Sequence, residues 1–431
     1  MRSMFKRSLI AASVMGAIAA AGTAHATNGY QLIGVGAYQK SLAGAVTAAP
    51  GSAMTAITNP AGLARIEDRA DFSMEAFMPK RSTDFAGGDK VDSDVELYGV
   101  PALGWKGPVG ESGKMWFGGG MYGTSGLGVD YEQTSMGGGM LWDGYSAIQF
   151  WQMAPALAWN VNDKLDLGVS LNIDYQSVSF KQRVVDGGGN VAQNFDLSKG
   201  ASAFGFGVTL GALYDVSENL TLGVSYKSKQ SFSDLEYNLA AGDIAGPFDP
   251  NNPMTVVNLP AGKYTLDLDY PQQLSAGLAY DVSDKVTVSA DVKWIDWSDT
   301  MSKLAVEGPG GVEVPMDPEW EDQIVYAIGV QWAVNEKVNL RAGFNYAEAP
   351  IQDDYVQRNF ILPAVVEQHY TFGGDIKLDK HWDLGFHVMY VPEETMKVTS
   401  TNDPMFPGGT PVGTEISMDQ SSVGVNLGYR F

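Results

Sequence analysis

The sequence contains no cysteine and only four histidines. The absence of cysteine excludes a disulfide framework, a thiol nucleophile and any cysteine-based metal site. The histidines that follow residue 26 are His369, His381 and His387, and no serine or aspartate forms a recognisable catalytic pattern with any of them. Isolated histidines are weak candidates for a general base. We therefore expect no catalytic residue, no metal site and no cofactor.

Long hydrophobic runs and positive charge are also scarce. After the first 26 residues no run of eighteen apolar residues exists, which excludes a bundle of transmembrane helices. The chain has 28 Lys and Arg residues against 50 Asp and Glu residues, for a formal net charge of −22. Such an acidic balance argues against nucleic acid as a partner. It fits an exported protein with acidic surface loops.

The beginning of the chain has the pattern of a secretory signal peptide. Three cations in the first seven residues precede an apolar run over 9–21, and Ala24-His25-Ala26 has the small-x-small form of a cleavage site. We expect residues 1–26 to be removed, so that the mature chain begins near Thr27.

Residues 27–69 differ from everything that follows them. They are rich in glycine and alanine, contain Pro50 and Pro60, and show no strand-like alternation. Their leucines, isoleucines and valines are too numerous for a disordered tail. We expect this segment to form a compact plug, or hatch, and residues 70–431 to form a separate domain.

Alternation of apolar and polar residues dominates the rest of the chain and is clearest at 165–175, which reads LDLGVSLNIDY. Successive side chains of a strand point to opposite faces, so this stretch has one apolar and one polar face. In an outer-membrane barrel the apolar face meets lipid, the polar face lines the lumen, and about 9–11 residues cross the bilayer. A single strand of this kind also fits a soluble sandwich.

The full set of strands decides between these folds. Candidate strands lie at about 70–79, 95–105, 115–123, 150–160, 164–177, 202–215, 220–232, 264–281, 285–298, 322–334, 337–348, 365–378, 381–396 and 420–431. Short polar turns, such as 160–164 and 215–219, alternate with long loops, such as 124–149 and 233–263, as in bacterial barrels. Closure is required because an open sheet edge in lipid leaves backbone groups unpaired. The sequence predicts an all-β, 14-stranded antiparallel transmembrane barrel over 70–431, monomeric and located in the bacterial outer membrane.

Aromatic residues near strand ends are expected to form interfacial belts. They are Trp159, Tyr214, Tyr280, Trp297, Trp332 and Trp382. The chain ends in an alternating strand with a carboxyl-terminal Phe431, which resembles the assembly signal of outer-membrane barrels. The expected partners are therefore outer-membrane lipid and lipopolysaccharide around the barrel, and the outer-membrane assembly machinery at this last strand.

Four stretches carry a family resemblance. They are Asn28-Gly-Tyr-Gln-Leu32, Asn59-Pro60-Ala61 with the Gly-Leu that follows, 291–298 and 340–351. Together with the strands they resemble the FadL/TodX family of outer-membrane transporters for long-chain fatty acids and other hydrophobic compounds. The resemblance implies a barrel closed by a hatch that carries the Asn-Pro-Ala motif. It also implies capture of an oily substrate at an outer groove, transfer to an inner pocket, and lateral release through a wall gap at a kinked third strand.

The third predicted strand itself indicates a kink. It contains Gly118, Gly119 and Gly120, and consecutive glycines weaken a strand and mark a bend or a bulge. The predicted function is passive uptake of fatty acids or aromatic and aliphatic hydrocarbons, with first capture by apolar residues of the long outer loops. The alternatives are a general diffusion porin and an outer-membrane lipid-modifying enzyme.

Two groups of residues are candidates for ligand binding. In the hatch they are Tyr30, Leu32, Ile33 and Val35, for which simple packing is an equal alternative. In the barrel, strand parity places Lys293 and Arg341 in the lumen, where a cation could meet the carboxylate of a fatty acid. The alternative, which the inward-facing aspartates favour, is that these cations belong to ion-pair networks of the lumen.

Overall fold

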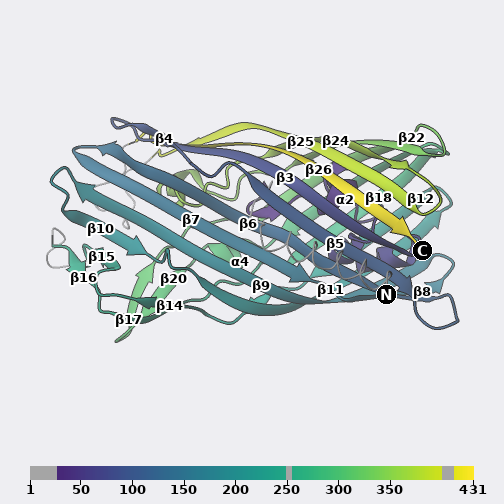
Figure 1. Ribbon diagram of the computed structural model, residues 1–431, viewed down its shortest axis with the longest axis horizontal. Helices are drawn as coiled ribbons and strands as arrows, with labels where there is room; N and C mark the ends of the chain where they lie inside the picture. Colours follow the sequence, from purple (N-terminus) through teal and green to yellow (C-terminus); the bar gives the residue numbers. More distant parts are fainter. Residues whose placement is uncertain (1–26, 249–254, 400–411) are drawn as a thin grey trace, which may run out of the picture.

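The computed structural model describes residues 27–248, 255–399 and 412–431. The predicted signal peptide, 1–26, lies outside the described residues. In the part of the chain that is described, no helix is long and apolar enough to cross a membrane. The wall is a closed antiparallel barrel of 14 strands (Figure 1), so the predicted fold class is confirmed.

The barrel strands follow one another around the wall in chain order. They are β3 (Arg69–Asp84), β5 (Tyr98–Pro108), β6 (Met115–Gly137), β7 (Met140–Met153) continued by β8 (Ala156–Asn162), β9 (Leu165–Asp186), β11 (Ala201–Ser217), β12 (Leu220–Lys227), β18 (Gln273–Ser283), β19 (Val286–Ile295), β22 (Gln323–Ala333), β23 (Val338–Tyr346), β24 (Gln368–Lys377), β25 (Trp382–Lys397) and β26 (Glu415–Arg430). Strand β26 pairs with β3 over their full lengths, which closes the sheet and leaves no edge in lipid.

Shorter elements lie inside the barrel and in the long connections. The amino-terminal segment holds β1 (Thr27–Asn28), β2 (Gln31–Leu32), α2 (Gly36–Ser41), α3 (Thr55–Thr58) and a 3-10 helix, η1 (Pro60–Ala64). The connections hold β4 (Lys90–Asp92), β10 (Val191–Asp196), β13 (Ser231–Phe232), β14 (Leu235–Leu239), β15 (Ile244–Gly246), β16 (Val257–Asn258), β17 (Gly262–Leu266), α4 (Ser298–Met301), β20 (Ala305–Gly308), β21 (Val312–Pro315) and η2 (Asp353–Asn359). Strands β14, β17, β20 and β21 form a separate sheet.

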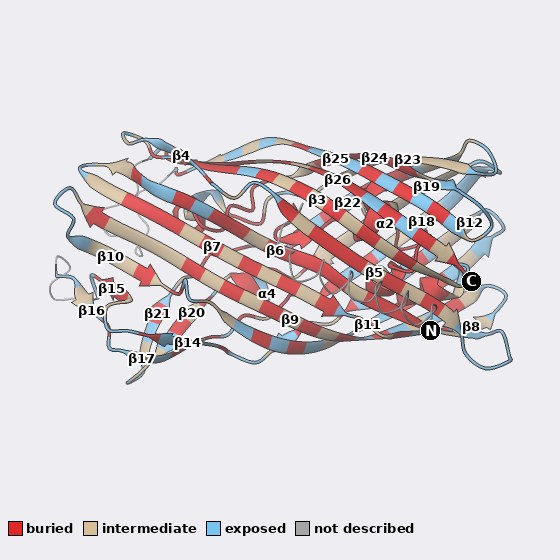
Figure 2. Cartoon of the chain, in the orientation of Figure 1, coloured by how far each residue is buried: buried red, intermediate tan, exposed pale blue. Residues whose placement is uncertain are grey.

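The predicted orientation of the strand faces is confirmed. On β9, Leu167, Val169 and Leu171 are 38–48 % exposed, whereas Asp166 and Ser170 on the opposite face are fully buried. Figure 2 shows the same alternation of buried and exposed residues along neighbouring strands of the barrel. Apolar side chains thus cover the outside of the wall, where lipid surrounds a barrel of the outer membrane.

The interior has two levels of different character. Near the short turns, inward positions are polar, as at Asp166, Ser170 and Asn172 of β9. Nearer the long connections the inward positions become apolar, as at Val178 and Phe180 of the same strand. We call these levels the turn-side half and the loop-side half. An apolar ligand is more stable in the loop-side half, where it replaces no hydrated polar group.

One predicted loop is wrong. Residues 124–149 are not a loop, because β6 and β7 continue through this stretch as a long hairpin that turns at 138–139. Strand β9 likewise continues to Asp186. The loop-side ends of these strands extend beyond the lipid, and there the alternation reverses: outward positions such as Ser177 of β9 become polar and inward ones apolar. Strand β18, by contrast, begins only at Gln273, later than predicted.

The orientation of the wall leads to a stability prediction. Val208 pairs with Leu171 near the middle of the lipid-facing band, whereas Val282 lies at its turn-side end. A Val208→Arg substitution should lower the free energy of unfolding by about 2–4 kcal/mol, and Val282→Arg by about 0–1 kcal/mol. Urea unfolding of the refolded barrel in lipid vesicles measures both. Equal losses for the two variants would contradict the assigned lipid-facing band.

Candidate functional site

The amino-terminal segment fills the middle of the barrel. Helix α2 contacts β3 and β23 to β26, whereas η1 contacts β6, β8, β9 and β11. Figure 1 shows α2 enclosed by the strands of the wall. Nearly every residue from Thr27 to Leu63 is buried. The segment therefore occupies the lumen and is in contact with widely separated parts of the wall.

Carboxylates of the turn-side half hold the backbone of this segment. Asp291 Oδ2 accepts hydrogen bonds from the amides of Val46 and Thr47, at 3.0 and 2.8 Å. Asp71 Oδ2 accepts one from the amide of Ala53 at 2.8 Å. Charge-assisted hydrogen bonds of this kind are stronger than neutral ones. They fix the segment at two points on different strands.

Ion pairs of Lys40 and Arg65 with carboxylates of the wall add to this attachment. Lys40 of α2 is fully buried, and its Nζ lies 3.2 Å from Glu75 Oε1 on β3. His387 Nε2 lies 3.6 Å from the same carboxylate oxygen. Arg65, just after η1, pairs with Asp166 of β9. Breaking such a buried pair leaves an uncompensated charge, so these contacts keep the central part of the segment in place.

The Asn-Pro-Ala motif lies at one of these attachment points. The Asn59 amide donates to the carbonyl oxygens of Thr47 at 2.8 Å and of Ala212 at 3.1 Å. Its Oδ1 accepts from the Ala61 amide at 3.2 Å and so caps η1, which begins with Pro60. The motif thus joins two parts of the segment to β11.

The barrel wall is interrupted between β5 and β6. The two strands pair from Pro108–Trp116 to Ala102–Tyr122, and no ladder pair follows until the isolated bridge between Ser93 and Tyr131. We call the stretch between residues 98–101 of β5 and 123–129 of β6 the wall gap. Across it, the Tyr98 hydroxyl donates to the Gly128 carbonyl at 3.3 Å. The gap is therefore bridged by a side chain instead of by the backbone ladder.

The three glycines of β6 lie directly beside this gap. Gly119 has φ +132°, and a Cβ built on it would lie 2.2 Å from the Ala154 carbonyl oxygen. At this level β6 changes partner from β8 to β7, which are separated at Ala154 and Pro155. The register shifts again between Gly123 and Ser125. Glycine is required at position 119, because an L-side chain would collide with the neighbouring backbone.

The amino-terminal segment closes the inner side of the wall gap. Gln31 of β2 pairs with Ser125 of β6, and the Gly126 amide donates to the Tyr30 carbonyl at 3.0 Å. The Gln31 side chain also donates to Gln273 Oε1 of β18 at 3.0 Å. Backbone groups of β6 that lack a partner on β5 thus find partners on the segment.

A small cavity lies behind this closure. From the segment it is lined by the predicted residues Leu32, Ile33 and Val35, and from the wall by Lys227 and Lys293. Its other lining residues are Gln31, Gly34, Gln39, Gly44, Thr47, Ile57, Thr58, Thr124, Ser225, Gln273 and Ser275. We call it the inner cavity. It combines a few apolar side chains with a mainly polar lining that includes two cations, and so suits the acidic head group of an amphiphile.

The two lysines of the inner cavity differ in their partners. Lys227 donates to Gln152 Oε1 at 3.0 Å. Lys293 makes no hydrogen bond or ion pair with any residue in the described ranges, although Asp291 is two positions away on the same strand. One oxygen of that carboxylate is already held by backbone amides of the segment. Lys293 is therefore available for an anion in the cavity.

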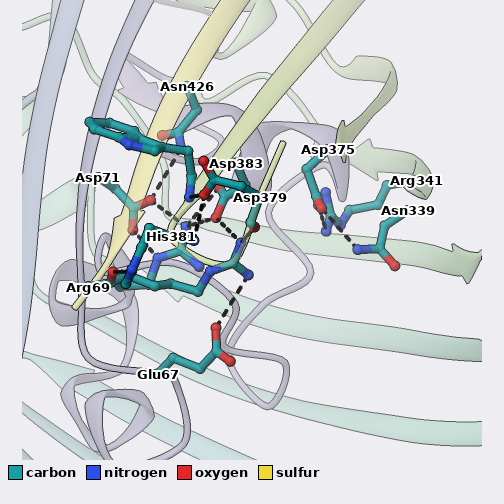
Figure 3. Close-up of polar contacts among 12 residues, drawn as sticks. Glu67, Arg69, Asp71, Asn339, Arg341, Asp375, Asp379, His381, Asp383 and Asn426 are labelled. Atoms are coloured by element: carbon teal, nitrogen blue, oxygen red, sulfur yellow. Dashed lines mark hydrogen bonds and ion pairs between the residues drawn. The ribbon is translucent and has the colours of Figure 1, made fainter. Parts of the chain in front are cut away.

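Arg341 has a different environment. It pairs with Asp375, donates through Nε to Gln331 Oε1 at 2.7 Å, and lies 4.5 Å over the ring of Tyr38. Figure 3 shows this pair, with Asn339 also donating to Asp375. Arg341 is absent from the lining of the inner cavity. Of the two predicted cations, only Lys293 shares a cavity with the hatch residues.

Tyr30 lies in an aromatic cluster instead of in the inner cavity. Its ring centroid is 4.6 Å from that of Trp297, 5.8 Å from Tyr270 and 5.9 Å from Trp320. The assignment of Trp297 to an interfacial belt is wrong, because this residue is fully buried. The chain turns inward after β19 ends at Ile295. The other predicted belt residues, Trp159, Tyr214, Tyr280, Trp332 and Trp382, are 40–49 % exposed.

Sequence reasoning placed Lys227 in the lumen without singling it out as a ligand-binding residue, and it missed Gln273 and Tyr270. Lys227 has inward parity, but only the order β12, β18, β19 shows that it lies near Lys293. Consecutive strands of a closed meander are neighbours in space, so the order of the strands along the chain indicates that Lys227 and Lys293 lie near each other. The sequence around Gln273 and Tyr270 gives no such signal, because 264–281 has the pattern of one continuous strand, whereas β18 begins only at Gln273.

Comparisons with known proteins agree with this fold. The family model described as "Outer membrane protein transport protein (OMPP1/FadL/TodX)" matches residues 13–431. A putative outer membrane protein, NMB0088 of Neisseria meningitidis, is 28% identical over 36% of this chain and 35% of its own length. Outer membrane protein P1 of Haemophilus influenzae is 23% identical over 53% of this chain and 48% of its own length. The matched part thus spans less than half of either relative.

Solved structures share the whole fold. The crystal structure of the Pseudomonas putida toluene transporter TodX has a TM-score of 0.71 and 22% identity, and the match covers 94% of this chain and 100% of that one. A Pseudomonas aeruginosa FadL homologue has a TM-score of 0.72 and 16% identity over 94% of this chain and 100% of that one. At these identities the likeness concerns the fold alone.

The attachment by Asp291 can be tested by hydrogen exchange. An Asp291→Ala substitution leaves the buried amides of Val46 and Thr47 without an acceptor, at a cost of about 1–3 kcal/mol. Exchange at these two amides should accelerate about tenfold or more, as measured by mass spectrometry of peptic fragments. The Ala53 amide, held by Asp71, is the internal control and should keep its rate. Unchanged exchange at Val46 and Thr47 would contradict this role.

Proposed function

The chain belongs to the outer membrane protein transport family that includes FadL and TodX, and we propose that it releases its hydrophobic cargo sideways through the wall gap. Membership makes it an outer-membrane transport channel for hydrophobic compounds, from a family of channels and not of enzymes. The observation that carries the proposal is the missing ladder between β5 and β6, next to a cavity lined by Leu32, Ile33 and Val35.

The amino-terminal segment acts as the hatch in this proposal. It supplies one side of the inner cavity and, through Tyr30 and Gln31, closes the wall gap. Movement of these residues away from β6 connects the cavity with the bilayer. The gap then gives a ligand a path to lipid that never crosses the polar turn-side half.

The polarity of the interior supports release through the side. In the turn-side half, Arg69 pairs with both Asp71 and Asp383, and Asn426 donates to Asp71 (Figure 3). An apolar chain passing downward would have to separate these charges from their partners. A ligand that leaves sideways moves from an apolar part of the lumen into the apolar interior of the bilayer. Each methylene that leaves water contributes about 0.8 kcal/mol, so uptake needs no external energy.

Capture begins at the outer connections. Phe248 and Val256, which border the undescribed residues 249–254, are 41 % and 37 % exposed. Apolar side chains in this position offer a first contact for an oily compound. From there the ligand enters the loop-side half, whose inward residues are apolar.

This proposal is preferred to the two alternatives. A general diffusion porin needs an open lumen, whereas residues 27–65 fill this one. A lipid-modifying enzyme needs a nucleophile with a base in reach. His387 contacts Glu75 and Ser422 through the same ring nitrogen, Nε2, so the carboxylate does not orient the imidazole toward the serine as in a catalytic triad.

A reversible cross-link tests closure of the wall gap by the hatch. The chain has no cysteine, and Gln31 is a strand partner of Ser125. Paired residues on antiparallel strands have Cα atoms about 4.5–5.5 Å apart, which suits a disulfide. The variant with both Gln31→Cys and Ser125→Cys should lose at least about 90 % of its laurate uptake by cells when oxidised, and regain it when reduced.

The single-cysteine variants are the controls for that experiment, because they change the same side chains without fixing the hatch. Both should take up laurate at the same rate with and without oxidant. Full uptake by the oxidised double variant would show that the ligand leaves by another route.

Lys293 is proposed to bind the carboxylate when the cargo is a fatty acid. A hydrogen bond to a charged group contributes about 1.5–3 kcal/mol, so Lys293→Gln should weaken laurate binding by roughly ten- to hundredfold. Binding of dodecanol, which has the same chain without the charge, should stay unchanged. Arg341→Gln is the matched control, because Arg341 already pairs with Asp375.

Isothermal titration calorimetry of the protein in detergent gives these affinities. Laurate binding that is equally strong in wild type and Lys293→Gln would remove Lys293 as the anchor. The apolar lining of the inner cavity would then be the whole basis of recognition, as for a hydrocarbon.

A further inference from the structure

Arg81 of β3 is a buried cation without an anion. The residue is 5 % exposed and points into the loop-side half. One of its terminal nitrogens, Nη2, donates to the Val95 carbonyl and to the Tyr98 hydroxyl, the latter at 3.1 Å. Its buried Nε has no hydrogen-bond partner, and no carboxylate of the described residues forms an ion pair with it.

Such a group is costly unless something else satisfies it. Arginine keeps its proton under all physiological conditions, so burial cannot be relieved by loss of charge. The carbonyl, the hydroxyl and the Tyr98 ring, whose centroid lies 5.5 Å from the guanidinium carbon, are all neutral, so none of them supplies a negative charge. The Nε donor in particular has no acceptor from the protein. An anionic ligand would supply both the missing charge and the missing acceptor.

Arg81 lines a second cavity, which is separate from the inner cavity. The lining consists of Thr27, Gly29, Arg81, Tyr98, Gly126, Leu127, Gly128, Pro363, Ala364 and Met418. None of these residues lines the inner cavity. Apart from Arg81 and the hydroxyls, the lining is apolar or backbone, so this cavity has one charged group in an otherwise oily environment.

The second cavity lies at the wall gap. Tyr98 comes from the β5 side of the gap and residues 126–128 from the β6 side, and Thr27 and Gly29 belong to the hatch. The Arg81 guanidinium, the Tyr98 hydroxyl and the Gly128 carbonyl form a continuous chain of hydrogen bonds across the gap. A ligand in the gap therefore passes directly beside Arg81.

We propose that Arg81 forms a second carboxylate-binding site, which holds the acidic head group of an amphiphile while its chain lies in the wall gap. The second cavity measures about 10 Å³ while the hatch closes the gap, so the carboxylate enters it as the hatch moves away from β6, and the chain lies in the apolar gap. This inference rests on the proposed function, because it assumes that cargo leaves through the gap. It adds a binding site that is distinct from the one at Lys293. During transfer, the carboxylate moves from Lys293 to Arg81.

The experiment counts bound ligands by native mass spectrometry of the full chain released from detergent micelles, with laurate and dodecanol as probes. Wild type should bind two laurates. Arg81→Met, which keeps the length of the side chain without its charge, should bind one, and Arg81→Lys should bind two. Lys293→Gln should also bind one, and the double variant none. Dodecanol binding should be the same in all of them.

A second variant keeps the test valid if Arg81→Met fails to form a heat-modifiable barrel on gels. Ala364→Leu leaves Arg81 in place and fills the second cavity from the opposite side. It should also remove one laurate, with at least a tenfold loss of affinity at that site.

The results separate this inference from the proposed function. Two laurates bound to Arg81→Met or to Ala364→Leu, with wild-type affinity, would overturn the second site and leave lateral release intact. A wild-type protein that binds neither laurate nor dodecanol would overturn the proposed function itself.

Discussion

Hydrogen bonding of the backbone within the lipid is the constraint on which the rest of this structure depends. Because lipid offers no partners, each strand must pair with both neighbours, and the pairing of β26 with β3 completes the circle. The wall gap breaks this rule between β5 and β6. The structure compensates with partners from elsewhere: the Tyr30 carbonyl, the backbone of Gln31 and the Tyr98 hydroxyl. The interruption of the ladder and the groups that replace it therefore lie at the same place in the wall.

The attachment of the amino-terminal segment also explains how charges are arranged in the lumen. Carboxylates of the turn-side half are engaged with the hatch, as Asp291 is with Val46 and Thr47. Lys293, at the inner cavity, forms no hydrogen bond or ion pair with the described residues, and Asp291 acts on it only through its charge. The contact that attaches the amino-terminal segment and the proposed carboxylate-binding lysine thus lie two residues apart on β19.

The sequence was sufficient for the fold but not for the whole site. Alternation at 165–175 predicted the lipid-facing band, because residues two apart in a strand must share a face. It failed where the wall leaves the lipid: polarity reverses there, and the hairpin of 124–149 was interpreted as a loop. The glycines of β6 indicated the kink. The sequence could not predict that Arg341 forms an ion pair and Lys293 does not, because strand parity gives the face to which a side chain points but not the residue that it contacts. Trp297 failed for a related reason, since it follows the strand end and turns inward.

The contacts of the hatch also divide it mechanically. From Lys40 to Arg65 it is attached by ion pairs and charged hydrogen bonds, whereas Tyr30 and Gln31 are joined to the barrel by a few neutral ones. Between these parts lies Gly36, with φ +74°, a position where a backbone can pivot. Three neutral hydrogen bonds are together worth about 1.5–4.5 kcal/mol. Ring contacts of Tyr30 with Trp297, Tyr270 and Trp320 add to these hydrogen bonds. The proposed release path therefore requires the short arm before Gly36 to give up both kinds of contact, while the part from Lys40 to Arg65 stays attached by its ion pairs.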